Sequence, residues 1–165
     1  MRTLVIGGTG PTGPFIVNGL LERGHHVTIF HRGTHELDEI PDEVVHLHGD
    51  PHFTETIESA LAGHTFDLVV ATYGRIRLIA EVLAGRVGRL VSVGGYAIYH
   101  GFSDPRALHP AGLTVPVGED APLADDETEE RFSTLIARTE AAVFRHHPTA
   151  THFRYPYVYG AYQLV

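Results

Sequence analysis

A glycine-rich run near the N-terminus, GGTGPTG, has the composition and spacing of a phosphate-binding loop. It separates a short apolar, β-branched segment from a segment with helical periodicity, so it should connect a strand to a helix. In this setting Gly7 allows a tight turn, Gly10 lets the backbone approach a pyrophosphate, and Gly13 permits close helix packing. The helix N-terminus offers unpaired N–H groups and partial positive charge to the phosphates. Because Pro11 has no N–H, the N–H of Thr12 should carry more of this contact; the alternative is a structural turn.

The end of the second predicted strand indicates which dinucleotide is expected. NAD-binding proteins usually place an Asp or Glu there to hold the ribose hydroxyls. Here His31 and Arg32 follow Phe30, and no acid occupies the position. The guanidinium of Arg32 can pair with a 2′-phosphate and lie on the adenine. We therefore expect His31 and Arg32 to contact NADP(H), with NAD(H) disfavoured; the alternative is that Arg32 is an ordinary surface residue.

Two more segments should lie beside the same cofactor. Asp50 follows the third predicted strand, where its carboxylate can accept a hydrogen bond from an adenine amino group. Capping of the following helix is the other role open to Asp50. Ala71 and Thr72 follow the fourth predicted strand and are expected beside the nicotinamide ribose.

The chain contains 13 histidines, which raises the question of a metal site. His46 and His48 alternate on the third predicted strand and should share a face, with His52 nearby. Zinc sites need three or four ligands on a rigid frame with supporting partners. Since these histidines adjoin the expected adenine edge, we interpret them as solvated or hydrogen-bonded side chains and predict no metal site.

The elements that must position these residues alternate between strand and helix. Strands are predicted over 3–8, 26–30, 44–47, 67–71, 89–93 and 151–155, and helices over 11–23, 54–62, 75–84 and 128–146. Alternation of this kind implies right-handed crossovers and a parallel sheet covered on both faces. We therefore predict one doubly wound α/β domain over residues 1–165, a Rossmann fold with strand order 3-2-1-4-5-6.

Composition excludes several classes of partner. The net charge is −8 and all 12 cationic side chains are Arg, without a basic stripe, so we expect no nucleic-acid partner. No apolar run reaches the roughly 20 residues that span a bilayer, so we expect no membrane partner. Without Lys, a P-loop of the Walker type is excluded. The absence of Cys and of a signal peptide is compatible with a cytoplasmic protein.

Several segments, in the right order, resemble the extended short-chain dehydrogenase family, which includes sugar-nucleotide epimerases and dehydratases. GGTGPTG is similar to its GGxGxxG fingerprint, and Asp50 matches its adenine-contacting Asp. VSVGGYAIY at 91–99 resembles V-x-x-S-S-x-x-V-Y, PVGEDAPL at 116–123 resembles P-x-x-E-x-x-P-x, and RYPYVYG at 154–160 resembles R-x-x-x-V-Y-G. The resemblance implies the N-terminal Rossmann part of an NAD-dependent epimerase or dehydratase.

The catalytic residues that this resemblance implies are altered. The family uses a Tyr, a Lys four residues later that lowers the phenol pKa, and a Ser or Thr that polarises the substrate. Counting back four from Tyr99 puts the Ser position at Gly95. Aligning FSTLIARTEAA with Y-x-x-x-K-x-x-x-E gives Thr134 for Tyr and Arg138 for Lys. Tyr96 is the nearest candidate for a replacement acid, although an ordinary loop aromatic is the favoured interpretation.

The resemblance also implies a C-terminal lobe over the substrate, which is largely absent from this sequence. The chain is then a fragment, one part of a split protein, or a reduced member of the family. Two functions remain open: an atypical NADP(H)-dependent oxidoreductase or epimerase, and a non-catalytic redox sensor or scaffold. We favour the enzyme slightly because the cofactor site is retained, although fold alone does not establish function. An enzyme would take a small-molecule substrate, and the expectation allows for a homodimer.

Overall fold

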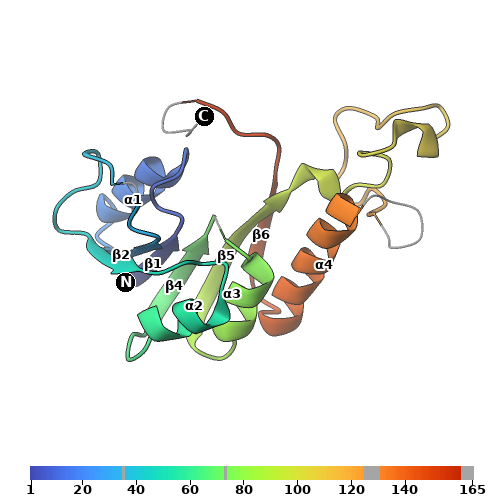
Figure 1. Ribbon diagram of the computed structural model, residues 1–165. Helices are drawn as coiled ribbons and strands as arrows, with labels where there is room; N and C mark the ends of the chain where they lie inside the picture. Colours follow the sequence, from blue (N-terminus) through green and yellow to red (C-terminus); the bar gives the residue numbers. More distant parts are fainter. Residues whose placement is uncertain (35, 73, 125–130, 161–165) are drawn as a thin grey trace.

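A six-stranded sheet forms the centre of the protein, shown by a computed structural model that describes all residues except 35, 73, 125–130 and 161–165 (Figure 1). The strand order is β3-β2-β1-β4-β5-β6, and every neighbouring pair is parallel. The strands are β1 (Arg2–Ile6), β2 (His26–His31), β3 (Val45–His48), β4 (Phe66–Ala71), β5 (Val87–Gly95) and β6 (Thr151–Tyr155). The predicted doubly wound fold and its strand order are confirmed.

Helices cover both faces of this sheet (Figure 1). They are α1 (Gly13–Leu21), α2 (Thr54–Ala60), α3 (Ile76–Val82) and α4 (Arg131–His146). Alternate strand residues point to opposite faces, so Leu4 and Ile6 enter a core shared with α2, α3 and α4. Val5 enters a second core, which is covered by Val17 of α1. The two cores hold the sheet between its helix layers, with the carboxyl ends of the parallel strands along one edge.

Several element boundaries differ from the predicted ones by one or two residues, and two of these differences bear on the site. The first helix begins at Gly13, and the proline in its first turn is Pro14, whereas Pro11 stays in the preceding turn. Strand β5 extends to Gly95 because Gly94 and Gly95 pair with β6 and do not begin a loop. At Gly94 a Cβ atom would lie 2.3 Å from Nε2 of His152, so any larger residue would force that buried ring to shift.

The connection between β5 and α4 contains two short 3-10 helices, η1 (Tyr96–Ile98) and η2 (Pro105–Ala107). It folds back on itself, since the N–H of His100 donates to the Pro122 carbonyl at 2.9 Å. The predicted start of the last helix, at 128, lies outside the described residues. Within the part of the chain that the structure describes, every helix is too short or too polar to cross a bilayer.

Candidate functional site

The glycine-rich loop joins β1 to α1 at the carboxyl edge of the sheet. Gly7 has a φ of 92°, a conformation that favours glycine. The N–H of Gly10 donates to the Gly7 carbonyl at 3.2 Å, and the N–H of Gly13 donates to the Gly10 carbonyl at 2.9 Å. A Cβ atom on Gly13 would lie 2.1 Å from the carbonyl oxygen of Gly8. Gly13 is therefore required for the helix to pack directly on the loop.

The outer side of this loop has room for an anion. A Cβ atom on Gly10 would find only the Gly7 carbonyl oxygen within 4 Å, at 3.5 Å. The N–H of Gly13 is already used, and Pro14 has no N–H. Among the described residues, the N–H of Thr12 has no hydrogen-bond partner, and its hydroxyl does not cap the helix. The loop and helix start thus fit a pyrophosphate, with Thr12 as a donor.

Thr72 supports the strand from which this loop begins. Its N–H and its hydroxyl both donate to the Ile6 carbonyl, at 2.9 and 3.1 Å. Ala71 pairs with Ile6 in the sheet and is fully buried. The turn after β4 therefore adjoins the glycine-rich loop, and the contact of Ala71 and Thr72 with a nicotinamide ribose stays a prediction.

Arg32 follows the carboxyl end of β2, and Asp50 follows the carboxyl end of β3. The Asp50 carboxylate accepts from the backbone N–H of His52 at 2.9 Å, and it lies 2.8 Å from Nδ1 of that ring. These hydrogen bonds, aided by the charge of Arg32, lower the pKa of Asp50. Helix α2 has Phe53 at its N-cap and no side-chain cap, so the capping role for Asp50 is wrong.

The turns after β3 and β4 are locked against each other. The N–H of Arg75 donates to the Pro51 carbonyl at 3.1 Å. Gly74 has a φ of 92°, and a Cβ atom there would lie 2.7 Å from Cβ of Pro51. The corner containing Asp50 is therefore held beside the corner containing Thr72, which gives the strand ends one continuous edge for a ligand.

His31 was expected to contact the cofactor, and its ring is instead engaged with β3. It is only 5% exposed, and its ring lies edge-on to His46 and His48, with centroids 5.1 and 4.9 Å away. Burial lowers the pKa of His31, and the Glu36 carboxylate offsets this only in part. The ring is turned toward β3 and Glu36, and the contact of His31 with a cofactor stays a prediction. His52, predicted near His46 and His48, instead contacts Asp50.

Beyond β5 lies an apolar pocket of about 210 Å³. Its lining residues are Gly94, Gly95, Tyr96, Ala97, Phe102, Phe132, Ile136, Tyr155, Pro156 and Tyr157. Of the three predicted catalytic residues, only Tyr96 is among them. Thr134 is buried and its hydroxyl donates to the Arg131 carbonyl at 3.1 Å, whereas Arg138 is exposed on α4. The structure therefore does not bring Tyr96, Thr134 and Arg138 together in one site.

The residues of α4 that face the pocket are Phe132 and Ile136. They fit the Y-x-x-x-K-x-x-x-E pattern when its Glu is placed at Glu140, eight residues after Phe132 and four after Ile136. A Cβ atom on Gly95 would lie 3.0 Å from Cδ1 of Ile136, so the Ser position and the Lys position face each other. Phe132 and Ile136, and not Thr134 and Arg138, line the pocket, so an alignment shifted by two residues fits the geometry better. The spacing from Glu140 is the signal that the sequence analysis did not use.

Behind this pocket the buried Glu140 forms an ion pair with the partly buried Arg154. Its carboxylate accepts two hydrogen bonds from the guanidinium of Arg154, at 2.7 and 2.9 Å. Arg154 also donates to the Tyr99 hydroxyl at 3.0 Å and to the Glu119 carbonyl at 2.9 Å. The paired carboxylate raises the pKa of Arg154. This network connects α4 and the η1 turn to β6. Because Tyr99 is only 3% exposed, its phenol is not available to a ligand.

Comparison with known proteins agrees with this geometry. Residues 7–130 match the NAD(P)H-binding family, and this range contains the glycine-rich loop, Arg32, Asp50 and Thr72. The chain belongs to the NAD(P)H-binding family. A curated relative of this NAD(P)H-binding protein is a chloroplast stem-loop binding protein of 41 kDa from Arabidopsis thaliana, 31% identical over 86 residues. That match covers 45% of this chain and 23% of the relative.

Solved structures share the fold. The Bordetella bronchiseptica enzyme WbmH in complex with NAD⁺ matches with a TM-score of 0.77 at 17% identity, covering 99% of this chain and 58% of that enzyme. UDP-glucose 4-epimerase from Thermotoga maritima matches with a TM-score of 0.75 at 16% identity, covering 97% and 57%. The chain thus shares the Rossmann fold of these enzymes and spans little more than half of their length.

Proposed function

We propose that this protein binds NADP(H) in preference to NAD(H) and lacks the acid–base chemistry of epimerases and dehydrogenases. The pyrophosphate would lie on the glycine-rich loop against the N–H of Thr12, and the 2′-phosphate near Arg32. The proposed lack of acid–base chemistry rests on one observation: the α4 residues that line the apolar pocket are Phe132 and Ile136, which cannot transfer a proton. A redox sensor or cofactor-dependent scaffold is the function that this arrangement supports best.

The proposed NADP(H) preference rests on the charges that follow β2 and β3, where the adenosine of the cofactor is expected. His31 occupies the place of the usual acid, and Arg32 lies close enough to Asp50 to lower the pKa of that carboxyl. A 2′-phosphate carries charge that an acid at the end of β2 would repel and that a guanidinium attracts. Arg32 can therefore distinguish the two dinucleotides.

Arg32→Ala is expected to weaken NADP⁺ binding by about 1.5–3 kcal/mol, roughly ten- to a hundredfold, with little effect on NAD⁺. Calorimetric titration of both cofactors against the wild-type and variant proteins measures this difference. Arg23→Ala is the matched control, because Arg23 lies just after α1 and its guanidinium donates to the Gly19 carbonyl of that helix. Equal affinities of the wild-type protein for the two cofactors would show that Arg32 does not select the phosphate.

Because Gly95, Phe132 and Ile136 supply no acid–base group at the three aligned positions, we expect turnover near background with sugar-nucleotide and simple carbonyl substrates. Gly95 has no hydroxyl to polarise a carbonyl, Phe132 has no phenol to move a proton, and Ile136 has no charge to lower a pKa. Loss of one well-placed acid typically costs about 10²–10⁴-fold. NADPH consumption across a panel of carbonyl compounds, followed by absorbance, tests this expectation.

The alternative function is an atypical oxidoreductase, and the observation in its favour is that Tyr96 lines the pocket. Its predicted cation, Arg138, does not line that pocket, so the phenol has no matched partner on α4. Turnover by the wild-type protein that Tyr96→Phe removes, with the fold intact, would establish this alternative in place of the sensor or scaffold.

Partners and the activity of a longer protein are also matters of proposal. The chain spans little more than half of the solved relatives, so a fragment of a larger epimerase or reductase remains an alternative. One curated relative is named for stem-loop binding. In this chain, the net charge of −8 and the absence of Lys oppose contact with phosphate backbones, and we propose no nucleic-acid partner.

A further inference from the structure

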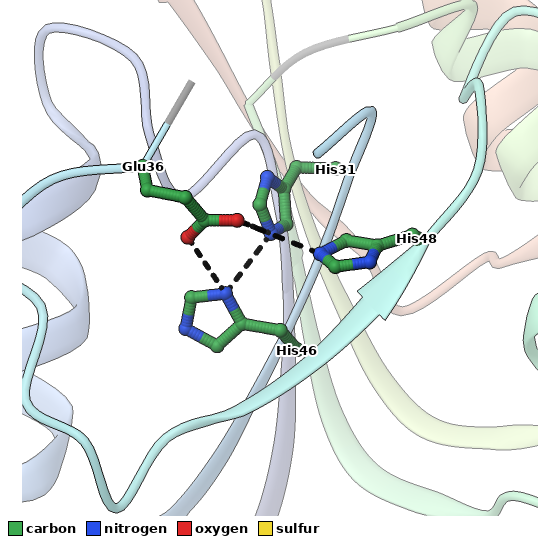
Figure 2. A group of neighbouring side chains, drawn as sticks. All are labelled: His31, Glu36, His46 and His48. Atoms are coloured by element: carbon green, nitrogen blue, oxygen red, sulfur yellow. Dashed lines mark hydrogen bonds and ion pairs between the residues drawn. The ribbon is translucent and has the colours of Figure 1, made fainter. Parts of the chain in front are cut away.

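Three histidines and a glutamate converge at the carboxyl ends of β2 and β3 (Figure 2). His31 ends β2, His46 and His48 lie on β3, and Glu36 lies in the loop between the strands. In the parallel register His31 pairs with His48, and His46 is two residues before His48. The three imidazoles therefore share one face of the sheet, and the loop brings the Glu36 carboxylate over them.

The four ligand atoms are as close together as the ligands of one metal ion. The Glu36 carboxylate lies 3.0 Å from Nδ1 of His46, 3.6 Å from Nε2 of His48 and 3.8 Å from Nε2 of His31. Nε2 of His31 lies 3.2 Å from Nδ1 of His46, and all four ligand atoms lie within 4.8 Å of one another. In a tetrahedral zinc site with bonds of about 2.0–2.1 Å, neighbouring ligand atoms are about 3.4 Å apart.

We propose that His31, Glu36, His46 and His48 form a binding site for one divalent transition-metal ion, with Zn²⁺ as the expected occupant. Three imidazole nitrogens and one carboxylate are a ligand set that suits zinc, and that also accepts Cu²⁺, Ni²⁺ and Co²⁺. This site replaces the sequence interpretation of solvated histidines, and it uses His31 and Glu36 where His52 was considered.

Burial across the cluster is graded, which suits entry of an ion. The His31 side chain is 5% exposed and that of His46 is 26% exposed, whereas His48 and Glu36 are 56% and 54% exposed. The buried pair gives the site a rigid floor on the sheet, and the exposed pair can open and close over an ion.

Metal binding requires two local changes. The hydrogen bond between Nε2 of His31 and Nδ1 of His46 is given up, because both nitrogens must be unprotonated to bind a metal. The N–H of Gly33 donates to Nδ1 of His31 over a long 3.3 Å. When Nε2 binds a metal, the neutral ring carries its proton on Nδ1, so this contact is given up. Gly33 is exposed, and its N–H can turn to water at small cost. The cluster would then tie the β2–β3 loop to the sheet, independently of any nucleotide.

Zinc binding by the untagged, chelator-stripped protein tests the proposal, with a chromogenic chelator as competitor. One ion per chain is expected, with a rise in melting temperature. His48→Ala and Glu36→Gln change the two exposed ligands, so they should preserve the circular dichroism spectrum. Each is expected to weaken Zn²⁺ binding by about a hundredfold or more, beyond the 10–100-fold typical of supporting residues.

His64→Ala is the matched control, because His64 is an exposed histidine outside the cluster. It should leave the affinity for Zn²⁺ unchanged. Co²⁺ should give the intense visible absorption of a tetrahedral site in the wild-type protein, and this absorption should be lost in His48→Ala. Less than one ion per chain, or equal affinities of His48→Ala, Glu36→Gln and His64→Ala, would refute the site.

Discussion

Gly10→Val is expected to abolish NADP(H) binding while leaving the free energy of unfolding nearly unchanged. The new Cβ atom would meet only the Gly7 carbonyl oxygen, at an ordinary contact distance of 3.5 Å, so the loop can keep its conformation. The same side chain would occupy the space in which a pyrophosphate approaches the backbone and the N–H of Thr12. Affinity should fall by roughly a hundredfold or more, about 2.7 kcal/mol, in calorimetric titrations.

Gly13→Ala provides the contrast that separates binding from folding. Its Cβ atom would lie 2.1 Å from the carbonyl oxygen of Gly8 and 2.3 Å from the carbonyl carbon, and both atoms are backbone. The helix must then move away from the loop, at a cost typical of overpacking, about 1–3 kcal/mol. Gly13→Ala should lose stability as well as binding. Full retention of NADP(H) binding by Gly10→Val would show that the loop is only a structural turn.

Glu140→Ala is expected to destabilise the protein by about 3–5 kcal/mol. The substitution leaves the Arg154 guanidinium, whose side chain is 20% exposed, without its carboxylate partner. A guanidinium keeps its proton in proteins even without a carboxylate partner, so the cation will not escape by losing its proton. Since a domain of this size has a total stability of about 5–15 kcal/mol, the loss is large. Urea unfolding followed by circular dichroism measures it.

Two variants test whether the ion pair is the cause. Glu58→Gln removes a carboxylate from the exposed surface of α2 and should change stability by less than about 0.5 kcal/mol. Combining Glu140→Met with Arg154→Met removes both charges and should recover much of the loss, because no buried charge is left unpaired. A loss below about 1 kcal/mol for Glu140→Ala would contradict the role assigned to this pair.

The position of the nucleotide-binding loop could be predicted from local sequence alone. Gly7, Gly10 and Gly13 indicate a dinucleotide-binding loop only when they lie between a strand and a helix. The alternation of apolar segments predicted both of these elements. Parallel connection rules then fixed the strand order without any contact being known. Arg32, Asp50 and Thr72 follow successive strands, so their arrival at one edge also followed from topology.

Which residues of α4 line the pocket could not be predicted reliably from the sequence. A helix turns by about 100° per residue, so a shift of two residues exchanges Thr134 and Arg138 for Phe132 and Ile136. The alignment had no Tyr or Lys to fix its register. The buried pair of Glu140 with Arg154 fixes it in the structure, because it sets the rotation of α4 against β6.

The sequence by itself determined the Rossmann fold, the glycine-rich loop and the alternation of His46 with His48 on one strand. Only the tertiary structure decided which third and fourth side chains join those histidines. His31 reaches them through the register of β2 against β3, and Glu36 through the path of the connecting loop. Both depend on packing between segments distant along the chain, where local periodicity carries no information. His52, although closer in sequence, follows the turn after β3 and contacts Asp50 instead.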